Sequence, residues 1–249
     1  MEGAWFYAEL KRRFSTLLAE RGLLTEQVKL TAKSLTPEEA IGVTKRRDYP
    51  ILTGRDVMVQ AECGGCPGQA FTEAPSSFEG TLAEVCGMDI EGDAHARGIF
   101  IASLNAVMCR LGLACRTVHC RNDGPERCAE LAAERIRREY GRPRIALIGY
   151  QPSLLAELAK EFPLRVLDLD PKNIGLLSSG VTVGDGGDAQ LRKEVCSWAE
   201  LILCTGSVVC NGSIVNFLDY GNVLYYGTTL AGAAALMGLP RLCFTDKLR

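Results

Sequence analysis

The chain has 249 residues, which is enough for one large domain or two smaller ones with a buried core. Charged residues make up 23% of it and the formal net charge is −2, which excludes the strongly basic surface that binds nucleic acid or an anionic membrane. The N-terminus has no apolar signal segment, so we expect the 11 cysteines to be reduced thiols or metal ligands in a cytoplasmic protein.

The first part of the chain has the pattern of a mixed α+β unit. Apolar residues recur at helical spacing over residues 4–21, and they alternate with polar residues around Val28 as in a strand. Thr36-Pro-Glu-Glu39 is a capping box with proline in the first turn, which predicts a short helix ending near Gly42.

A glycine-rich turn brings the first two candidate ligands together. Residues 57–61 predict a strand that leads into Cys63-Gly-Gly-Cys66, and residues 69–73 predict its return strand. Such a turn allows two thiolates to converge on one point, as in a Cys-x-x-Cys metal knuckle. Metal or cluster ligands, redox thiols and bystander cysteines all stay open as interpretations of Cys63 and Cys66.

A second long helix is predicted over residues 93–111, where apolar positions dominate. Asn105 is unusual inside this apolar run. Contact with the backbone of another segment is the favoured interpretation of its side chain, ahead of contact with a ligand.

Another pair of cysteines flanks the next loop. A strand is predicted to end near His119, beside Cys120, and Pro125 is predicted to start a helix that runs to about Tyr140. Cys128 falls in the first turn of that helix, where the helix dipole stabilises a thiolate. Cys63, Cys66, Cys120 and Cys128 could therefore complete a zinc site or hold an iron–sulfur cluster, while independent thiols are the alternative.

From residue 144 onward, apolar strands alternate with helices, which predicts a parallel, Rossmann-like sheet. The apolar stretch 223–239 is interrupted by glycines and fits a strand, a turn and a helix better than a membrane span. The expected fold class is therefore α/β, with an N-terminal α+β domain over residues 1–128 and a Rossmann-like domain over residues 129–249.

Polar residues gather where the predicted strands end, which is where α/β sheets bind ligands. The first turn, Gly149-Tyr-Gln-Pro152, lacks the further glycines of a dinucleotide fingerprint, and no P-loop lysine or Gly-x-Ser-x-Gly elbow is present. The candidate ligand-binding residues are Gly149, Gln151, Asp168, Asp170, Asn173, Thr205, Gly206, Ser207, Asn211, Gly227, Thr228 and Thr229.

Several of these segments together resemble the heavy-metal chelation family, a group of uncharacterised prokaryotic proteins. The resemblance is carried by Ile145-Ala-Leu-Ile-Gly-Tyr-Gln-Pro152, residues 168–175, Leu203-Cys-Thr-Gly-Ser-Val-Val-Cys-Asn-Gly-Ser-Ile214, residues 226–232, and upstream by residues 36–42 and 98–106. It implies an enolase N-terminal-like α+β domain before the Rossmann-like domain, a site in the crevice between them, and a role in handling a metal or metallo-cofactor.

The leading hypothesis is a protein that binds a metal ion, an iron–sulfur cluster or a metal-containing small molecule between its two domains. The alternative is an enzyme that binds a nucleoside-type ligand such as S-adenosylmethionine, with Asp168 or Asp170 at the ribose and with structural or redox cysteines. A metal carrier without turnover is a third interpretation. A homo-oligomer is compatible with the sequence, and no catalytic residue can be assigned.

Overall fold

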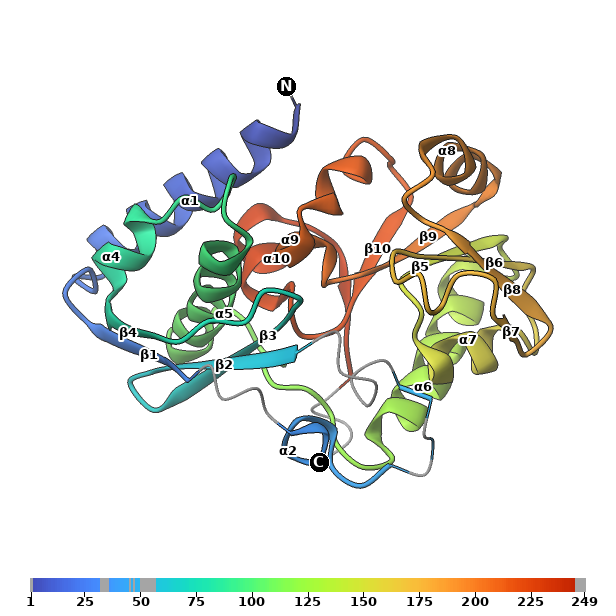
Figure 1. Cartoon of the computed structure of the whole chain (residues 1–249), viewed down its shortest axis with the longest axis horizontal. Helices are drawn as coiled ribbons and strands as arrows, with labels where there is room; N and C mark the ends of the chain where they lie inside the picture. Colours follow the sequence, from blue (N-terminus) through green and yellow to red (C-terminus); the bar gives the residue numbers. More distant parts are fainter. Residues whose placement is uncertain (1, 32–35, 45, 47, 50–56, 245–249) are drawn as a thin grey trace.

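The computed structural model describes residues 2–31, 36–44, 46, 48–49 and 57–244. It contains a four-stranded sheet and a seven-stranded sheet that lie side by side (Figure 1). The α/β class and the two-part architecture predicted from the sequence are both present.

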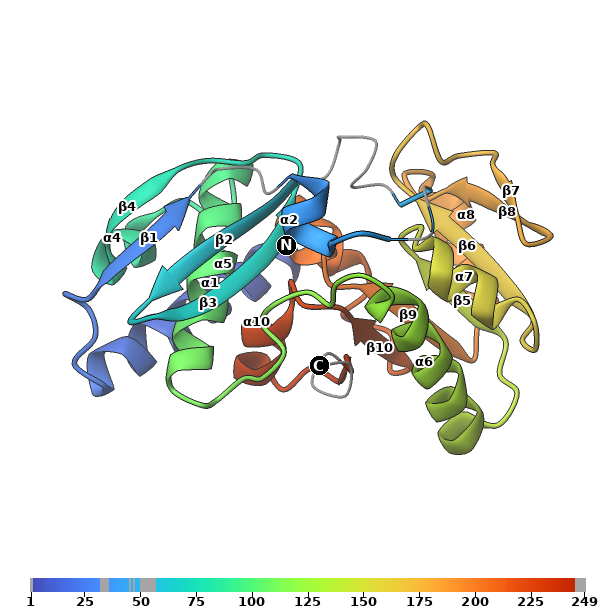
Figure 2. The same cartoon turned by 90° about the horizontal axis from the view of Figure 1, so that it is seen from below.

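The N-terminal sheet is antiparallel and has the order β3-β2-β1-β4. Its strands are β1 (Gln27–Thr31), β2 (Val57–Cys63), β3 (Cys66–Thr72) and β4 (Phe78–Thr81). Helices α1 (Glu2–Glu20), α4 (Leu82–Gly87) and α5 (Ala94–Arg110) cover one face of it, as Figures 1 and 2 both show, and the short α2 (Pro37–Ile41) lies near β2 and β3. Gly64 and Gly65 connect β2 to β3 with φ values of 57° and 77°, the positive angles that a two-residue type I′ hairpin turn requires.

The second sheet has the order β11-β10-β9-β5-β6-β8-β7 and is parallel except for β7 at its edge. Without the edge strand β7, and with β5 counted as strand 1, the order from β8 to β11 is 3-2-1-4-5-6, the strand order of a Rossmann fold. The strands are β5 (Ile145–Ile148), β6 (Leu164–Asp168), β7 (Leu177–Ser178), β8 (Val181–Asp185), β9 (Leu201–Thr205), β10 (Val223–Tyr226) and β11 (Arg241–Leu242).

Helices lie on both faces of this sheet. Those helices are α6 (Gly124–Tyr140), α7 (Pro152–Leu158), α8 (Ala189–Trp198), α9 (Val208–Asn211) and α10 (Ala231–Met237), with a 3₁₀ turn, η1, at Ser213–Asn216. Alternate strand residues pack into different cores: Leu201 and Leu203 contact the α6 and α7 side, whereas Ile202 and Cys204 join the core that also holds the N-terminal helices. The two parts of the chain therefore share one continuous apolar core.

Some local predictions were wrong and others incomplete. The strand expected to end near His119 is absent, because residues 113–123 form an irregular segment in which Arg116 has a φ of 60°. Thr117 nevertheless pairs with the edge of β3, since its carbonyl accepts from Gln69 N at 2.9 Å. Strands β4, β7 and β8 were not predicted. The expected division between residues 128 and 129 lies within α6 and stays a prediction.

Among the described residues, no helix combines the length and apolar composition needed to span a bilayer.

Asn105 joins the two parts of the molecule. Its side chain is fully buried in α5, and Nδ2 donates to the carbonyl oxygens of Gln69 at 2.8 Å, Thr229 at 2.9 Å and Thr228 at 3.4 Å. Its Oδ1 accepts from Gly232 N at 2.6 Å, at the start of α10. The expectation that Asn105 contacts the backbone of another segment is confirmed, and we refer to these bonds as the Asn105 clamp.

Asn105→Ala is expected to lower the free energy of unfolding by about 3–5 kcal/mol, because it leaves several buried backbone groups without partners. Urea denaturation followed by circular dichroism measures this change. Ser103→Ala is the matched control, since Ser103 is equally buried in α5 but its Oγ has no hydrogen-bond partner. An Asn105 variant as stable as the Ser103 variant would show that the clamp contributes nothing.

Candidate ligand-binding site

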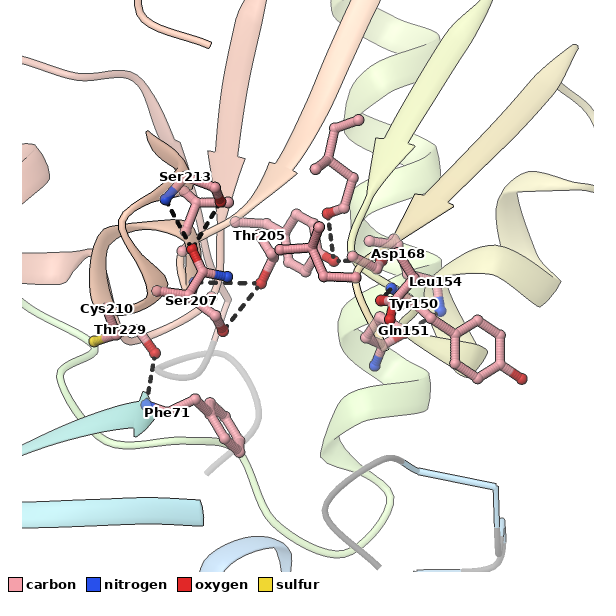
Figure 3. A pocket seen from close by; sticks show the side chains of 18 of the residues that line it. Phe71, Tyr150, Gln151, Leu154, Asp168, Thr205, Ser207, Cys210, Ser213 and Thr229 are labelled. Atoms are coloured by element: carbon pink, nitrogen blue, oxygen red, sulfur yellow. Dashed lines mark hydrogen bonds between the residues drawn. The ribbon is translucent and has the colours of Figure 1, made fainter. Parts of the chain in front are cut away.

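A cavity of about 510 Å³ opens where the strands of the seven-stranded sheet end and the N-terminal sheet approaches them. Figure 3 shows Thr205 and Ser207 on one side of this space and Asp168, Tyr150 and Gln151 on the other. All of the loop residues predicted to bind a ligand line it: Gly149, Gln151, Asp168, Asp170, Asn173, Thr205, Gly206, Ser207, Asn211, Gly227, Thr228 and Thr229.

The turn after β5 approaches β9 closely. Gly149 has a φ of 91°, and a Cβ at this position would lie 2.7 Å from Thr205 Cγ2, so only glycine fits. Gln151 then caps α7 by accepting a hydrogen bond from Leu154 N. The turn thus lies at the point where the strand order reverses, which is the usual ligand crevice of such sheets.

Asp168, at the end of β6, organises the turns around it. Its Oδ2 accepts from Tyr150 N at 2.6 Å, and its Oδ1 accepts from Asp170 N at 2.8 Å and from Asn173 Nδ2 at 3.1 Å. The carboxylate therefore holds the turn after β5 and the turn after β6 in fixed positions. A ligand hydroxyl would have to share these oxygens, whose lone pairs are already partly used.

The loop after β9 is fixed by hydrogen bonds within itself and by a buried arginine. Thr205 Oγ1 donates to Ser207 Oγ at 3.3 Å, and Asn211 Oδ1 accepts from the Ser213 hydroxyl at 2.7 Å. Arg97, which is only 8% exposed, donates from Nε to the Cys210 carbonyl at 2.7 Å. Because Arg97 belongs to α5, the N-terminal part of the chain also positions this loop.

The loop after β10 completes the wall. Tyr226 donates its hydroxyl to the Gly149 carbonyl at 3.1 Å, and burial raises the pKa of this phenol, which keeps it a donor. Thr229 Oγ1 accepts from Phe71 N at 3.0 Å, a bond drawn in Figure 3. This contact ties the end of β3 to the cavity in addition to the Asn105 clamp.

Two of the predicted metal ligands, Cys120 and Cys128, also line the cavity. The neighbouring Cys120 thiol, followed by burial, raises the pKa of Cys128 well above its ordinary value, so the Cys128 thiol is protonated near neutral pH. His119 Nδ1 lies 2.6 Å from the Cys120 carbonyl, which can only accept, so Nδ1 carries the proton. Burial lowers the pKa of His119, and its imidazole is therefore neutral.

Cys63, at the end of β2, and Cys66, at the start of β3, lie elsewhere and do not line the cavity. His119 packs edge-to-face against Phe71, with ring centroids 5.5 Å apart. Phe71 lies five residues beyond Cys66 along β3, a rise of about 16 Å. Within the described ranges, no group of three or more His, Cys, Asp or Glu side chains could hold a metal ion. A single site formed by Cys63, Cys66, Cys120 and Cys128 is therefore not assembled, because β3 keeps the pairs apart.

Several lining residues were missed by sequence reasoning. They include Tyr49, Phe71, His119, Arg192, Tyr226 and Cys243. Arg192 contacts the rim through a hydrogen bond from Nη1 to the Gly186 carbonyl at 2.8 Å. Phe71 and His119 come from the N-terminal part of the chain, and only the tertiary arrangement brings them to the strand ends. Cys204 is fully buried in β9, as expected, while Cys210 is buried beside the cavity.

Cys128 is expected to react with iodoacetamide at least about tenfold more slowly at pH 7.5 than the exposed Cys115, because its raised pKa leaves little thiolate. The rate should rise as the pH is increased. Tryptic peptides 111–116, 117–121 and 128–135 each contain one of Cys115, Cys120 and Cys128, so mass spectrometry resolves the three rates. Equal rates for Cys115 and Cys128 in the native protein would contradict the described environment.

No protein-family model matches the chain, and no curated protein matches it. Among solved structures, it is similar to a DUF364-family protein of unknown function from Pyrococcus horikoshii, with 16% identity, a TM-score of 0.52, and coverage of 88% of this chain and 79% of that one. A DUF364-family protein of unknown function from Desulfitobacterium hafniense DCB-2 matches with 12% identity, a TM-score of 0.48, and coverage of 73% and 72%. The Pyrococcus likeness shows a shared two-domain α/β fold.

Proposed function

We propose that this protein binds a small molecule that contains or accompanies a soft metal ion, in the cavity at the ends of the Rossmann strands. The observation that carries the proposal is that the Cys120 and Cys128 thiols and the polar strand-end loops line the same cavity. Its volume of about 510 Å³ falls within the usual range for small-molecule sites, about 300–1,000 Å³.

The donor set favours an open metal site. A structural zinc site uses four protein ligands, and an iron–sulfur cluster is held by a comparable set of cysteines, so the Cys120 and Cys128 pair fits neither. Two thiolates do fit a soft metal ion whose other positions are filled by the bound molecule or by water.

The remaining walls suit the organic part of such a ligand. Ser207 and Thr229 offer hydroxyls, and Asn211 offers an amide. Apolar surface comes from Ile148 and Leu154 among others, which would shield the metal from water. This combination of an apolar body with a few polar groups is typical of sites that recognise a small organic molecule.

Protein purified without oxygen is expected to carry, or to take up, about one equivalent of a soft metal ion per chain, with Cd²⁺ as the titrated probe. Cys120→Ser and Cys128→Ser should each weaken Cd²⁺ binding by at least about tenfold, the low end of what changes around a metal ligand cost. Cadmium–thiolate absorption and calorimetry measure this loss. Cys115→Ser is the matched control for an exposed thiol in the same segment.

The variants Cys63→Ser and Cys66→Ser separate this proposal from a four-cysteine site. They should bind Cd²⁺ like the unmodified protein, because their thiols lie outside the cavity. Loss of binding in all of these cysteine variants would favour the four-cysteine site. Sub-stoichiometric metal together with no Cd²⁺ uptake by reduced protein would reject metal binding altogether.

A nucleoside-type ligand is the second candidate, and one observation favours it. The strand order is that of a Rossmann fold, and Asp168, at the end of the second strand of that order, lines the cavity at the position where such folds bind ribose hydroxyls. The hydrogen bonds that Asp168 already accepts argue for a weaker ribose contact than in dinucleotide-binding proteins.

If this second candidate holds, calorimetry should detect binding of S-adenosylmethionine, and Asp168→Asn should weaken it by roughly 10- to 100-fold through the loss of a charge-assisted hydrogen bond. Asp185→Asn is the control, because Asp185 accepts from Gly187 N at the neighbouring strand end without lining the cavity. Circular dichroism of both variants checks that the turns held by Asp168 are intact. Absence of binding, or equal affinity in both variants, would reject the nucleoside assignment.

A further inference from the structure

The β3 strand and helix α5 run past each other at close range, in opposite directions. A Cβ on Gly98 would lie 3.3 Å from Thr72 Oγ1, and one on Gly68 would lie 2.1 Å from Ala106 N. At the hairpin, a Cβ on Gly64 would lie 2.8 Å from Arg110 Nε. The two elements therefore keep a fixed register along the whole of β3.

This register brings two thiols together at the end of the interface. Cys109 lies one helical turn beyond Asn105 on the same face of α5, and Cys66 shares a strand face with Gly68, two residues away. The register places the two side chains as neighbours at this end of the interface, burial followed by the Cys109 thiol raises the pKa of Cys66, and both side chains are partly exposed. Cys63, which is paired with Cys66 across the hairpin, is buried and accepts a long hydrogen bond from Arg110 Nη1 at 3.6 Å.

We propose that Cys66 and Cys109 are a reversible disulfide site. A low-molecular-weight disulfide such as oxidised glutathione is the oxidant. One cysteine thiolate attacks it, which forms a mixed disulfide and releases one glutathione thiol. The second cysteine thiolate then attacks the protein sulfur of the mixed disulfide, which forms the Cys66–Cys109 bond and releases the second glutathione. Two protein thiols are thus oxidised, one glutathione disulfide is reduced to two thiols, and the two protons pass to the products.

The cross-link would act on the cavity through the Asn105 clamp. Cys66 lies three residues before Gln69 on β3, and Cys109 lies four residues after Asn105 on α5. The disulfide would therefore join β3 to α5 next to the hydrogen bond between Asn105 and the Gln69 carbonyl. Fixing β3 on α5 holds Asn105 against the Gln69 carbonyl. The same amide holds the Thr228 and Thr229 carbonyls, which belong to the cavity wall. This inference does not depend on which ligand the cavity binds.

The test treats the full-length, reduced protein with oxidised glutathione, blocks the remaining thiols and digests it under denaturing conditions. Trypsin leaves Cys66 in peptide 56–97 and Cys109 in peptide 98–110, so the proposed bond joins two peptides that are otherwise separate. A Cys63–Cys66 bond would stay within peptide 56–97, and that result would overturn the proposal, as would the absence of any cross-link. Reduction by dithiothreitol should release the two peptides.

Variants identify the partners. Cys66→Ser and Cys109→Ser should each abolish the cross-linked pair, whereas Cys86→Ser should leave it unchanged, because Cys86 lies in the same tryptic peptide but in helix α4. A cross-link that persists without Cys66 or without Cys109 would contradict the assignment.

Hydrogen exchange tests the coupling to the cavity. Oxidation should slow exchange of the Gly232 amide, which donates to Asn105 Oδ1, by about threefold or more, and raise the melting temperature by several degrees. The exchange of α6, which lies away from β3, serves as the internal reference. Unchanged exchange at Gly232 in cross-linked protein would show that the disulfide is not coupled to the clamp.

Discussion

The arrangement of this molecule depends on one buried amide. The Asn105 side chain has a donor group that reaches carbonyls of β3 and of the loop after β10, and an acceptor that reaches the start of α10. No apolar residue can satisfy these backbone groups, and a charged residue in the same place would be costly to bury. The amide therefore both links the two sheets and stabilises an irregular segment that has no sheet partner of its own.

The Asn105 clamp requires β3 and α10 to lie very close to α5, and glycines make this close packing possible. A Cβ on Gly232 would lie 2.9 Å from Leu104 Cγ and 3.0 Å from Asn105 Oδ1, and one on Gly68 would collide with the α5 backbone. Small residues at these positions let β3 and α10 reach α5 from different directions. The cavity is then bounded by the end of β3, because Phe71 N is held by Thr229 Oγ1. In this way the N-terminal sheet becomes a wall of a site whose floor is built by the Rossmann strands.

The sequence was informative where function follows from local position. Residues after a parallel strand must lie at the carboxyl edge of the sheet, so Gly149, Asp168, Thr205 and Thr228 could all be assigned to one surface before the strands were paired. Whether Cys63 and Cys66 meet Cys120 and Cys128 could not be judged from local position. It depends on how the segment that carries Cys120 and Cys128 lies along β3, which is a tertiary contact. Asp168 is an intermediate case: its position was predicted, but its hydrogen bonds to Tyr150 N and Asp170 N depend on turn geometry that the spacing does not specify.

The protonation state of the thiols connects this geometry to stability. The pKa of Cys128 is raised in the folded state, so folding favours its protonated form. That contribution is fully present below the ordinary thiol pKa of about 8.5 and is lost as the pH rises through the higher folded value. A soft metal ion would reverse the preference, because it binds the thiolate and supplies a positive charge beside it. The burial that helps to keep the Cys128 thiol unreactive without a metal is therefore the same property that would exclude water from a metal–thiolate bond once it formed.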